Sequence, residues 1–147
     1  MYGNPFTAFL QAHRLFTSKE VHLFSELISD PNPIHQSLNE ESDQLSQGKS
    51  QIVHGMLTAS IFSSIFGTLI PGSIYRSQNI LFHSPIYSNE EVIGRVNVKE
   101  VKDMKGRGMI VICDTIIEKK SDNNKTKDYD EMTLCVSGKA SVWLPVS

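Results

Sequence analysis

The sequence predicts an α+β protein in which an antiparallel sheet with one buried face packs on a long apolar helix. Two observations predict this class. Residues 50–89 hold a single formal charge, Arg76, over forty positions, and they include an apolar stretch long enough for a core helix. From residue 74 onward the sequence is dominated by strand-like alternation. A chain of 147 residues suits one domain, so we expect a single domain over residues 1–147.

Composition excludes two classes of partner. The chain carries 14 Lys and Arg against 16 Asp and Glu, a net charge of −2, whereas a nucleic-acid-binding domain typically has a pI above about 9. Residues 52–70 approach the length of a membrane span, but eight of these nineteen positions are polar, glycine or histidine. We therefore expect no nucleic acid and no membrane as partners. Residues 1–10 contain no Lys or Arg and show no targeting pattern, so we expect an intracellular protein.

The first elements follow from local signals. Residues 6–16 predict an opening strand. Thr17 is the expected N-cap of a helix, and Glu20, three residues later, completes a capping box. Apolar residues then recur at helical spacing, and Pro31 ends this helix because the residue before a proline is driven out of the helical region.

The central helix follows a polar segment. Residues 36–50 predict a loop with a helical turn, because they are mostly polar. The long apolar helix is expected over residues 55–66, and the Pro71-Gly72 pair closes it. An apolar helix of this kind must be covered by the sheet.

Strands fill the rest of the chain. We expect them over residues 74–83, 92–99, 109–117 and 134–144. Residues 105–108, Lys-Gly-Arg-Gly, predict a hairpin turn, and residues 118–131, with nine charges, predict an exposed connection. A curved antiparallel sheet around one central helix is the hot-dog fold. Such folds usually dimerise, and the open sheet edges here require cover, so we expect a homodimer.

Residues 30–35, Asp-Pro-Asn-Pro-Ile-His, are the most informative hexapeptide. They place an acid, Asp30, and a base, His35, five positions apart in a loop that two prolines stiffen. Such a loop holds its side chains in place before substrate arrives, which favours catalysis, and imidazole has a pKa suited to proton transfer near neutrality. The alternative is a purely structural turn, because Asp-Pro and Asn-Pro commonly start turns.

Residues 52–57, Ile-Val-His-Gly-Met-Leu, lie at the start of the apolar helix. Unpaired N–H groups at a helix start carry partial positive charge, and Gly55 lets a ligand oxygen approach them without meeting a Cβ atom. The same geometry stabilises an oxyanion. The alternative is a simple glycine N-cap. Ser63 lies two turns further on the same side as Gly55, and its alternative is a hydroxyl bonded to the preceding turn.

These two motifs, followed by Pro71-Gly72, resemble those of the MaoC-like (R)-specific enoyl-thioester hydratases, which have the hot-dog fold. The similarity extends over nearly the whole chain and is greatest to the compact 3-hydroxyacyl-thioester dehydratases of mitochondrial fatty acid synthesis. The resemblance implies an acid–base pair of Asp30 and His35 and an oxyanion-binding N–H at Gly55. It also implies supporting roles for Ser63 beside the aspartate, for Asn32 in the loop and for His54.

The activity implied by this resemblance is a reversible hydro-lyase reaction between trans-2-enoyl and (R)-3-hydroxyacyl thioesters in fatty acid metabolism. The substrate would be an acyl-CoA or an acyl-carrier-protein thioester, with no cofactor and no metal. The mitochondrial matrix is the compartment implied, or else the cytoplasm. Two other functions on the same fold stay open, an acyl-thioesterase and a non-catalytic acyl-thioester-binding module. The thioesterase is disfavoured because residues 55–75 contain no acid.

Overall fold

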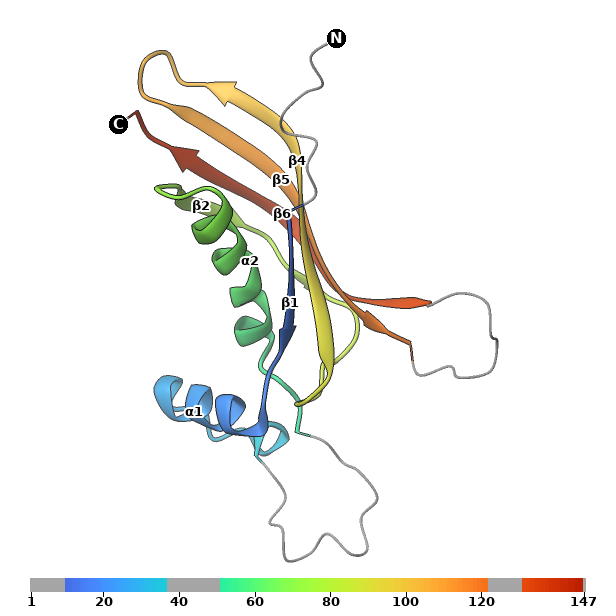
Figure 1. Ribbon diagram of the computed structural model, residues 1–147. Helices are drawn as coiled ribbons and strands as arrows, with labels where there is room; N and C mark the ends of the chain where they lie inside the picture. Colours follow the sequence, from blue (N-terminus) through green and yellow to red (C-terminus); the bar gives the residue numbers. More distant parts are fainter. Residues whose placement is uncertain (1–9, 37–50, 122–130, 147) are drawn as a thin grey trace, which may run out of the picture.

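The computed structural model describes residues 10–36, 51–121 and 131–146 (Figure 1). The described elements, in chain order, are β1 (Leu10–Leu15), α1 (Ser18–Ile28), the 3₁₀ helix η1 (Pro33–His35), α2 (Gly55–Leu69), β2 (Ile74–Gln78), β3 (Leu81–Phe82), β4 (Glu91–Asp103), β5 (Met109–Lys120) and β6 (Met132–Leu144). None of the helices in the described part is long and apolar enough to cross a membrane.

The strands form one antiparallel sheet. Its order is β1-β4-β5-β6-β2, and the short β3 also pairs with β6. Figure 1 shows the long strands β4, β5 and β6 bending past α2, which lies along one side of the sheet, while α1 lies near the N-terminal end of α2. The predicted α+β architecture is therefore confirmed.

The core lies between α2 and the sheet. Four α2 side chains are buried there: Ile61, Phe62, Ile65 and Phe66. The packing is close, because a Cβ atom at Gly94 of β4 would lie 2.4 Å from the Ile61 Cγ2 atom. The opposite side of α2 is exposed along its serines and at both ends. Among the described residues the sheet therefore covers one side of the helix, whereas the sequence predicted a helix that the sheet wraps.

Both helix starts follow from local chemistry. The Thr17 side chain accepts a hydrogen bond from the Glu20 N–H, and the Glu20 carboxylate accepts one from the Thr17 N–H, so the predicted capping box is confirmed. The N-cap of α2 is His54 rather than a glycine, and Gly55 is the first helical residue. This helix continues to Leu69, three residues beyond the predicted end, because proline restricts the helix only near position 71.

The strands differ from prediction at their ends. The stretch predicted as one strand over residues 74–83 forms two, β2 and β3, with an irregular register between Tyr75 and Ser77. Strand β5 runs to Lys120, into the predicted exposed connection, because Glu118 forms an ion pair with Arg95 across the sheet. The predicted hairpin turn after β4 is confirmed, with Gly106 and Gly108 both at positive φ. The predictions for residues 6–9, 37–50 and 122–130 lie outside the described residues.

Candidate active site

The loop after α1 is built around Asp30. Helix α1 ends at Ile28, its C-cap Ser29 has a left-handed backbone, and the Asp30 N–H then donates to the Ser25 carbonyl at 2.9 Å. The Asp30 Oδ1 atom accepts from the Asn32 N–H at 2.9 Å, and the Asn32 side chain accepts from the Ile34 N–H at 3.3 Å. The aspartate and asparagine therefore fold the loop back on itself, which fixes the direction in which each side chain leaves the backbone.

His35 is held by its neighbours and is 7% exposed. Its Nδ1 atom lies 2.6 Å from the Ile52 carbonyl oxygen. Because a carbonyl oxygen only accepts, Nδ1 must carry a proton, and in the neutral ring Nε2 then presents a lone pair. Gln51 donates to the His35 carbonyl at 2.6 Å and in turn accepts from the Ser18 hydroxyl at 2.7 Å. This network assigns the tautomer that a general base requires at Nε2.

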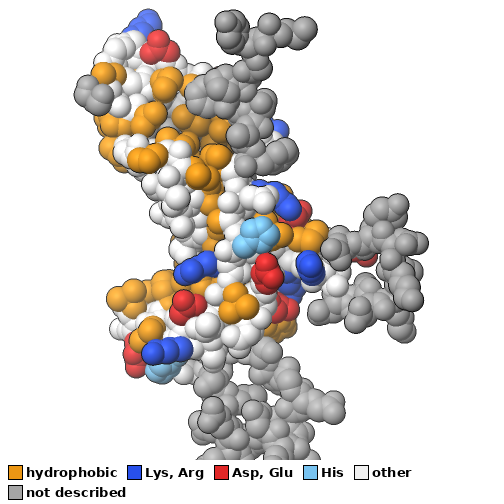
Figure 2. Space-filling view, viewed as in Figure 1, with side chains coloured by type: hydrophobic (Ala, Val, Ile, Leu, Met, Phe, Trp, Pro, Cys, Tyr) orange, Lys and Arg blue, Asp and Glu red, His pale blue; other side chains and the backbone are white. Residues whose placement is uncertain are grey.

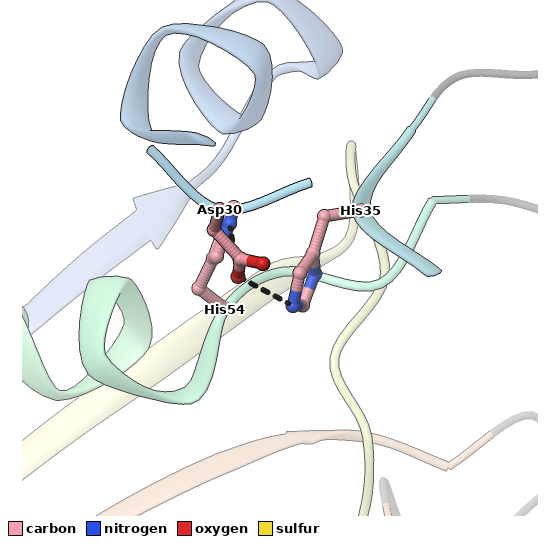
Figure 3. Close-up of side chains that lie close together, drawn as sticks. All are labelled: Asp30, His35 and His54. Carbon is pink, nitrogen blue, oxygen red and sulfur yellow. Dashed lines mark ion pairs between the residues drawn. The ribbon is translucent and has the colours of Figure 1, made fainter. Parts of the chain in front are cut away.

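Three side chains meet at this point (Figure 3). The Asp30 Oδ2 atom lies 3.8 Å from the His35 Nε2 atom and 3.6 Å from the His54 Nε2 atom. The two imidazole rings stack, with centroids 3.7 Å apart and planes inclined by 19°. The structure thus brings together the acid and the base predicted from one motif with the histidine of the other motif.

The N-terminus of α2 opens beside this group. The side chain of the N-cap residue, His54, makes no capping hydrogen bond, and the first backbone bond of the helix runs from the Thr58 N–H to the His54 carbonyl. The N–H of Gly55 precedes that bond and is therefore free of the helical ladder. A Cβ atom at position 55 would lie 2.7 Å from the Phe82 ring, so glycine allows the close approach of this ring.

A cavity of about 520 Å³ lies over this helix start. Most of its wall is apolar, and the wall also includes His35 and Gly55. The apolar wall residues are Ile34, Ile52, Val53, Met56, Phe82, Pro85, Ile86 and Val136. The wall also contains a second histidine, His83. An apolar cavity with His35 and a helix N-terminus at its wall suits a ligand with a hydrocarbon tail and a polar, reacting head.

Ser63 is not part of this cluster. It is exposed on α2, two turns beyond Gly55, and forms no hydrogen bond with Asp30 among the described residues. The serine that does lie at the cluster is Ser25 of α1, which is buried and whose hydroxyl is 3.0 Å from the His54 Nε2 atom. Sequence reasoning missed it. Its one signal is the spacing to Val21, four residues earlier, which puts Ser25 on the buried face of α1.

The cluster does not fit a metal ion in this geometry. Asp30, His35 and His54 each offer one possible ligand atom, and these three atoms lie within 4.8 Å of one another. A metal must lie close to the plane of each imidazole that binds it. With centroids 3.7 Å apart and an inclination of 19°, the two ring planes meet only about 10 Å away, several times the roughly 2 Å of a metal–imidazole bond.

Curated relatives are similar in sequence to most of this chain. The mitochondrial 3-hydroxyacyl-[acyl-carrier-protein] dehydratase of Arabidopsis thaliana is 29% identical over 92% of this chain and 75% of its own length. An (R)-specific enoyl-CoA hydratase of Aeromonas caviae is 37% identical over 61% of this chain and 67% of its own length.

A solved structure shares the fold. The (R)-hydratase from A. caviae involved in PHA biosynthesis superposes with a TM-score of 0.74 at 29% identity, covering 99% of this chain and all of its own. The predicted hot-dog fold is thereby confirmed. Residues 5–120 match the family model described as a MaoC like domain. The chain therefore belongs to the MaoC-like domain family.

Proposed function

We propose that this protein catalyses the reversible hydration of trans-2-enoyl thioesters to (R)-3-hydroxyacyl thioesters, with Asp30 and His35 as the acid–base pair. The observation that carries the proposal is their convergence, 3.8 Å apart, beside the wall of an apolar cavity. The predicted reaction class, hydration and dehydration in fatty acid metabolism, is confirmed by the family and its hydratase and dehydratase members.

The reaction needs two proton transfers. In hydration, the water oxygen bonds to C3 as one of its protons passes to a base, and the double-bond electrons move toward the thioester oxygen. A proton then reaches C2 from an acid. In dehydration a base takes the C2 proton, and the C3–O bond breaks as the leaving hydroxyl is protonated. In each direction Asp30 and His35 take up one proton in the first step and return it in the second, so the pair ends as it began. Positioned groups typically contribute 10²- to 10⁴-fold in such a role.

The spacing of the pair leaves room for substrate. At 3.8 Å, the Asp30 carboxylate and the His35 Nε2 atom are too far apart for a direct hydrogen bond. Both atoms are therefore available to a water molecule or to a substrate hydroxyl. The Nδ1–H bond to the Ile52 carbonyl holds the ring while Nε2 gains or loses its proton.

The Gly55 N–H supports the negative charge that develops on the thioester oxygen. It belongs to an uncapped helix start, where unpaired N–H groups and the helix dipole both favour an anion. One donor of this kind contributes roughly 100- to 1,000-fold in rate. The apolar wall of the cavity takes the acyl chain.

Carrier, compartment and assembly are parts of the same proposal. The substrate is an acyl-CoA or an acyl-carrier-protein thioester, and the mitochondrial matrix is supported by the mitochondrial plant relative.

The working unit is a homodimer. Hydrophobic side chains gather over β2 and the neighbouring ends of α2 and β6 (Figure 2), and the exposed ones include Leu69, Ile74 and Tyr75. A single monomeric species by light scattering would contradict the dimer.

The alternatives are less well supported. A thioesterase of this fold commonly places a carboxylate on the central helix, and the sequence of α2 contains neither Asp nor Glu. A non-catalytic binding module has no use for an acid and a base held together in a hydrogen-bonded loop.

The decisive assay distinguishes all three functions. Purified protein is given crotonyl-CoA while enoyl absorbance and free thiol are followed together. Hydration removes absorbance without releasing thiol and gives the (R)-3-hydroxy product. Thiol release at the same rate would establish a thioesterase, and binding without either change would establish a binding module. Repeating the assay with the crotonyl group on acyl carrier protein assigns the carrier.

A further inference from the structure

Behind the proposed acid–base pair lies a second buried pair, Ser25 and His54. Each is 4% exposed, and they come from elements 29 residues apart in the chain, α1 and the N-cap of α2. The Ser25 hydroxyl lies 3.0 Å from the His54 Nε2 atom. Burying two polar side chains is unfavourable unless their hydrogen bond is made, so this contact joins the two helices at the site.

Three neighbours fix the plane of the His54 ring. It stacks on His35 with centroids 3.7 Å apart, and the Phe24 ring meets it edge-on at 4.9 Å. The His54 Nε2 atom lies 3.6 Å from the Asp30 Oδ2 atom, whereas the His35 Nε2 atom lies 3.8 Å from it. The ring therefore contacts both members of the proposed acid–base pair, although the cavity wall does not include it.

The hydrogen bonds of His54 assign its proton. Its Nδ1 atom is buried and has no partner among the described residues. A buried N–H without an acceptor is rarer and costlier than a lone pair without a donor. The proton is therefore on Nε2, from which it is donated to the Ser25 hydroxyl and faces the Asp30 carboxylate.

The same surroundings keep His54 neutral. Burial lowers the pKa of His54, proximity to His35 lowers it further, and Asp30 opposes both with a smaller effect. Neutrality matters because two positively charged rings stacked this closely would repel each other. A neutral His54 lets His35 accept a proton during the reaction without that repulsion.

We propose that His54, held by Ser25, is a positioning residue that presents a neutral N–H to the Asp30 carboxylate beside His35. This inference rests on the proposed acid–base roles of Asp30 and His35. It assigns a function to a serine that neither sequence motif contains, and it gives His54 a role apart from capping the helix.

The test compares variants of matched size by crotonyl-CoA hydration. His54→Leu removes the N–H, whereas His54→Gln retains an N–H donor near the Nε2 position. We expect kcat to fall at least tenfold in His54→Leu with KM within about twofold, because the site rather than the acyl pocket is disturbed. His54→Gln should recover most of the loss.

Substitutions of Ser25 test the same positioning role with a smaller change in the core. Ser25→Ala should lower kcat about fivefold at unchanged KM, and Ser25→Thr should restore it. Ser60→Ala is the matched control, because Ser60 is exposed and, among the described residues, its hydroxyl donates to the Leu57 carbonyl of its own helix. Its kcat should equal that of the unmodified protein.

The outcomes separate this inference from the proposed function. If the unmodified protein does not hydrate crotonyl-CoA, the proposed function fails. A second outcome concerns the positioning role alone. If the unmodified protein is active and Asp30→Asn is inactive, but folded His54→Leu and Ser25→Ala keep normal kcat, then only the positioning role is wrong. Equal losses in His54→Leu and His54→Gln, without rescue by Ser25→Thr, would also overturn it, because they would show a requirement for ring shape rather than for the N–H.

Discussion

The side of α2 that faces the sheet and the end of α2 that faces α1 contain opposite kinds of buried side chain. Along the sheet the helix buries Ile61, Phe62, Ile65 and Phe66. At its N-terminus it meets buried polar residues: Ser25, His35, Gln51, His54 and Thr58. The first region is held by apolar area, which tolerates small shifts, and the second by directed hydrogen bonds, which do not. Substitutions in the two regions should therefore separate stability from catalysis.

The largest expected effect is on rate. Asp30→Asn and His35→Ala should each lower kcat by about 10²- to 10⁴-fold, because each removes one proton-transfer group. The thermal stability of Asp30→Asn should change little compared with a core substitution, since the Asp30 side chain is 29% exposed. Steady-state hydration of crotonyl-CoA together with thermal unfolding measures both. Normal turnover in either variant would contradict the roles proposed here.

The converse is expected in the apolar region. Phe62 is fully buried, and Phe62→Ala should lower the free energy of unfolding by about 3–5 kcal/mol, as truncation of a buried aromatic residue typically does. The kcat of the protein that remains folded should stay near normal. Denaturant titration gives the first quantity, and activity per folded molecule gives the second. A loss of kcat as large as in Asp30→Asn would show that the two regions are not separable.

A smaller effect is expected where the regions meet. In Gly55→Ala the new Cβ atom would lie 2.7 Å from the Phe82 ring. The ring is on a half-exposed side chain and can move, so we expect little loss of stability but a roughly tenfold loss of kcat/KM, equivalent to about 1.4 kcal/mol. Phe82→Ala in the same chain should restore most of it.

The matched glycine is Gly67, on the same helix. A Cβ atom there meets nothing within 4 Å, so Gly67→Ala should leave activity unchanged and stabilise the helix by roughly 0.5–1 kcal/mol. If Gly55→Ala lost activity equally with and without Phe82, the loss would come from the helix start itself rather than from this contact.

The smallest expected effect concerns pH. His54 has a pKa below its usual 6.5 in the folded protein, so between the folded and unfolded values the unfolded chain binds more protons. Stability from neutral His54 is therefore present above pH 6.5 and is lost as pH falls toward the lowered value. Unfolding temperatures of the parent protein should drop between pH 7 and pH 5 more than those of His54→Gln. Parallel curves would contradict a buried neutral histidine.

Local chemistry made much of this molecule predictable. The capping box of Thr17 and Glu20 and the Asp30–His35 loop are set by residues within a few positions of each other, and both lie where the sequence indicates. The long helix was predictable from the lack of charge. Its true end at Leu69 was not, because apolar spacing fades before the proline stops the helix.

Contacts between distant segments could not be predicted. The Ser25–His54 bond joins residues 29 positions apart, whereas the family resemblance implied that Ser63, which helical spacing puts on the same side of α2 as Gly55, supports the aspartate. Spacing identifies which side of a helix a residue occupies but not which other helix meets that side. The split into β2 and β3 has the same origin, because Asn79 breaks the strand by exchanging hydrogen bonds with Lys139 of β6.

The most direct test of the acid–base pair is a double-mutant comparison. Crotonyl-CoA hydration is measured for Asp30→Asn, His35→Ala and the double variant at equal folded concentration. If the two residues act as one unit, the double variant should be no more than a fewfold slower than the slower single variant, because losing either one already stops proton transfer. Losses that multiply would contradict a single acid–base pair at this site.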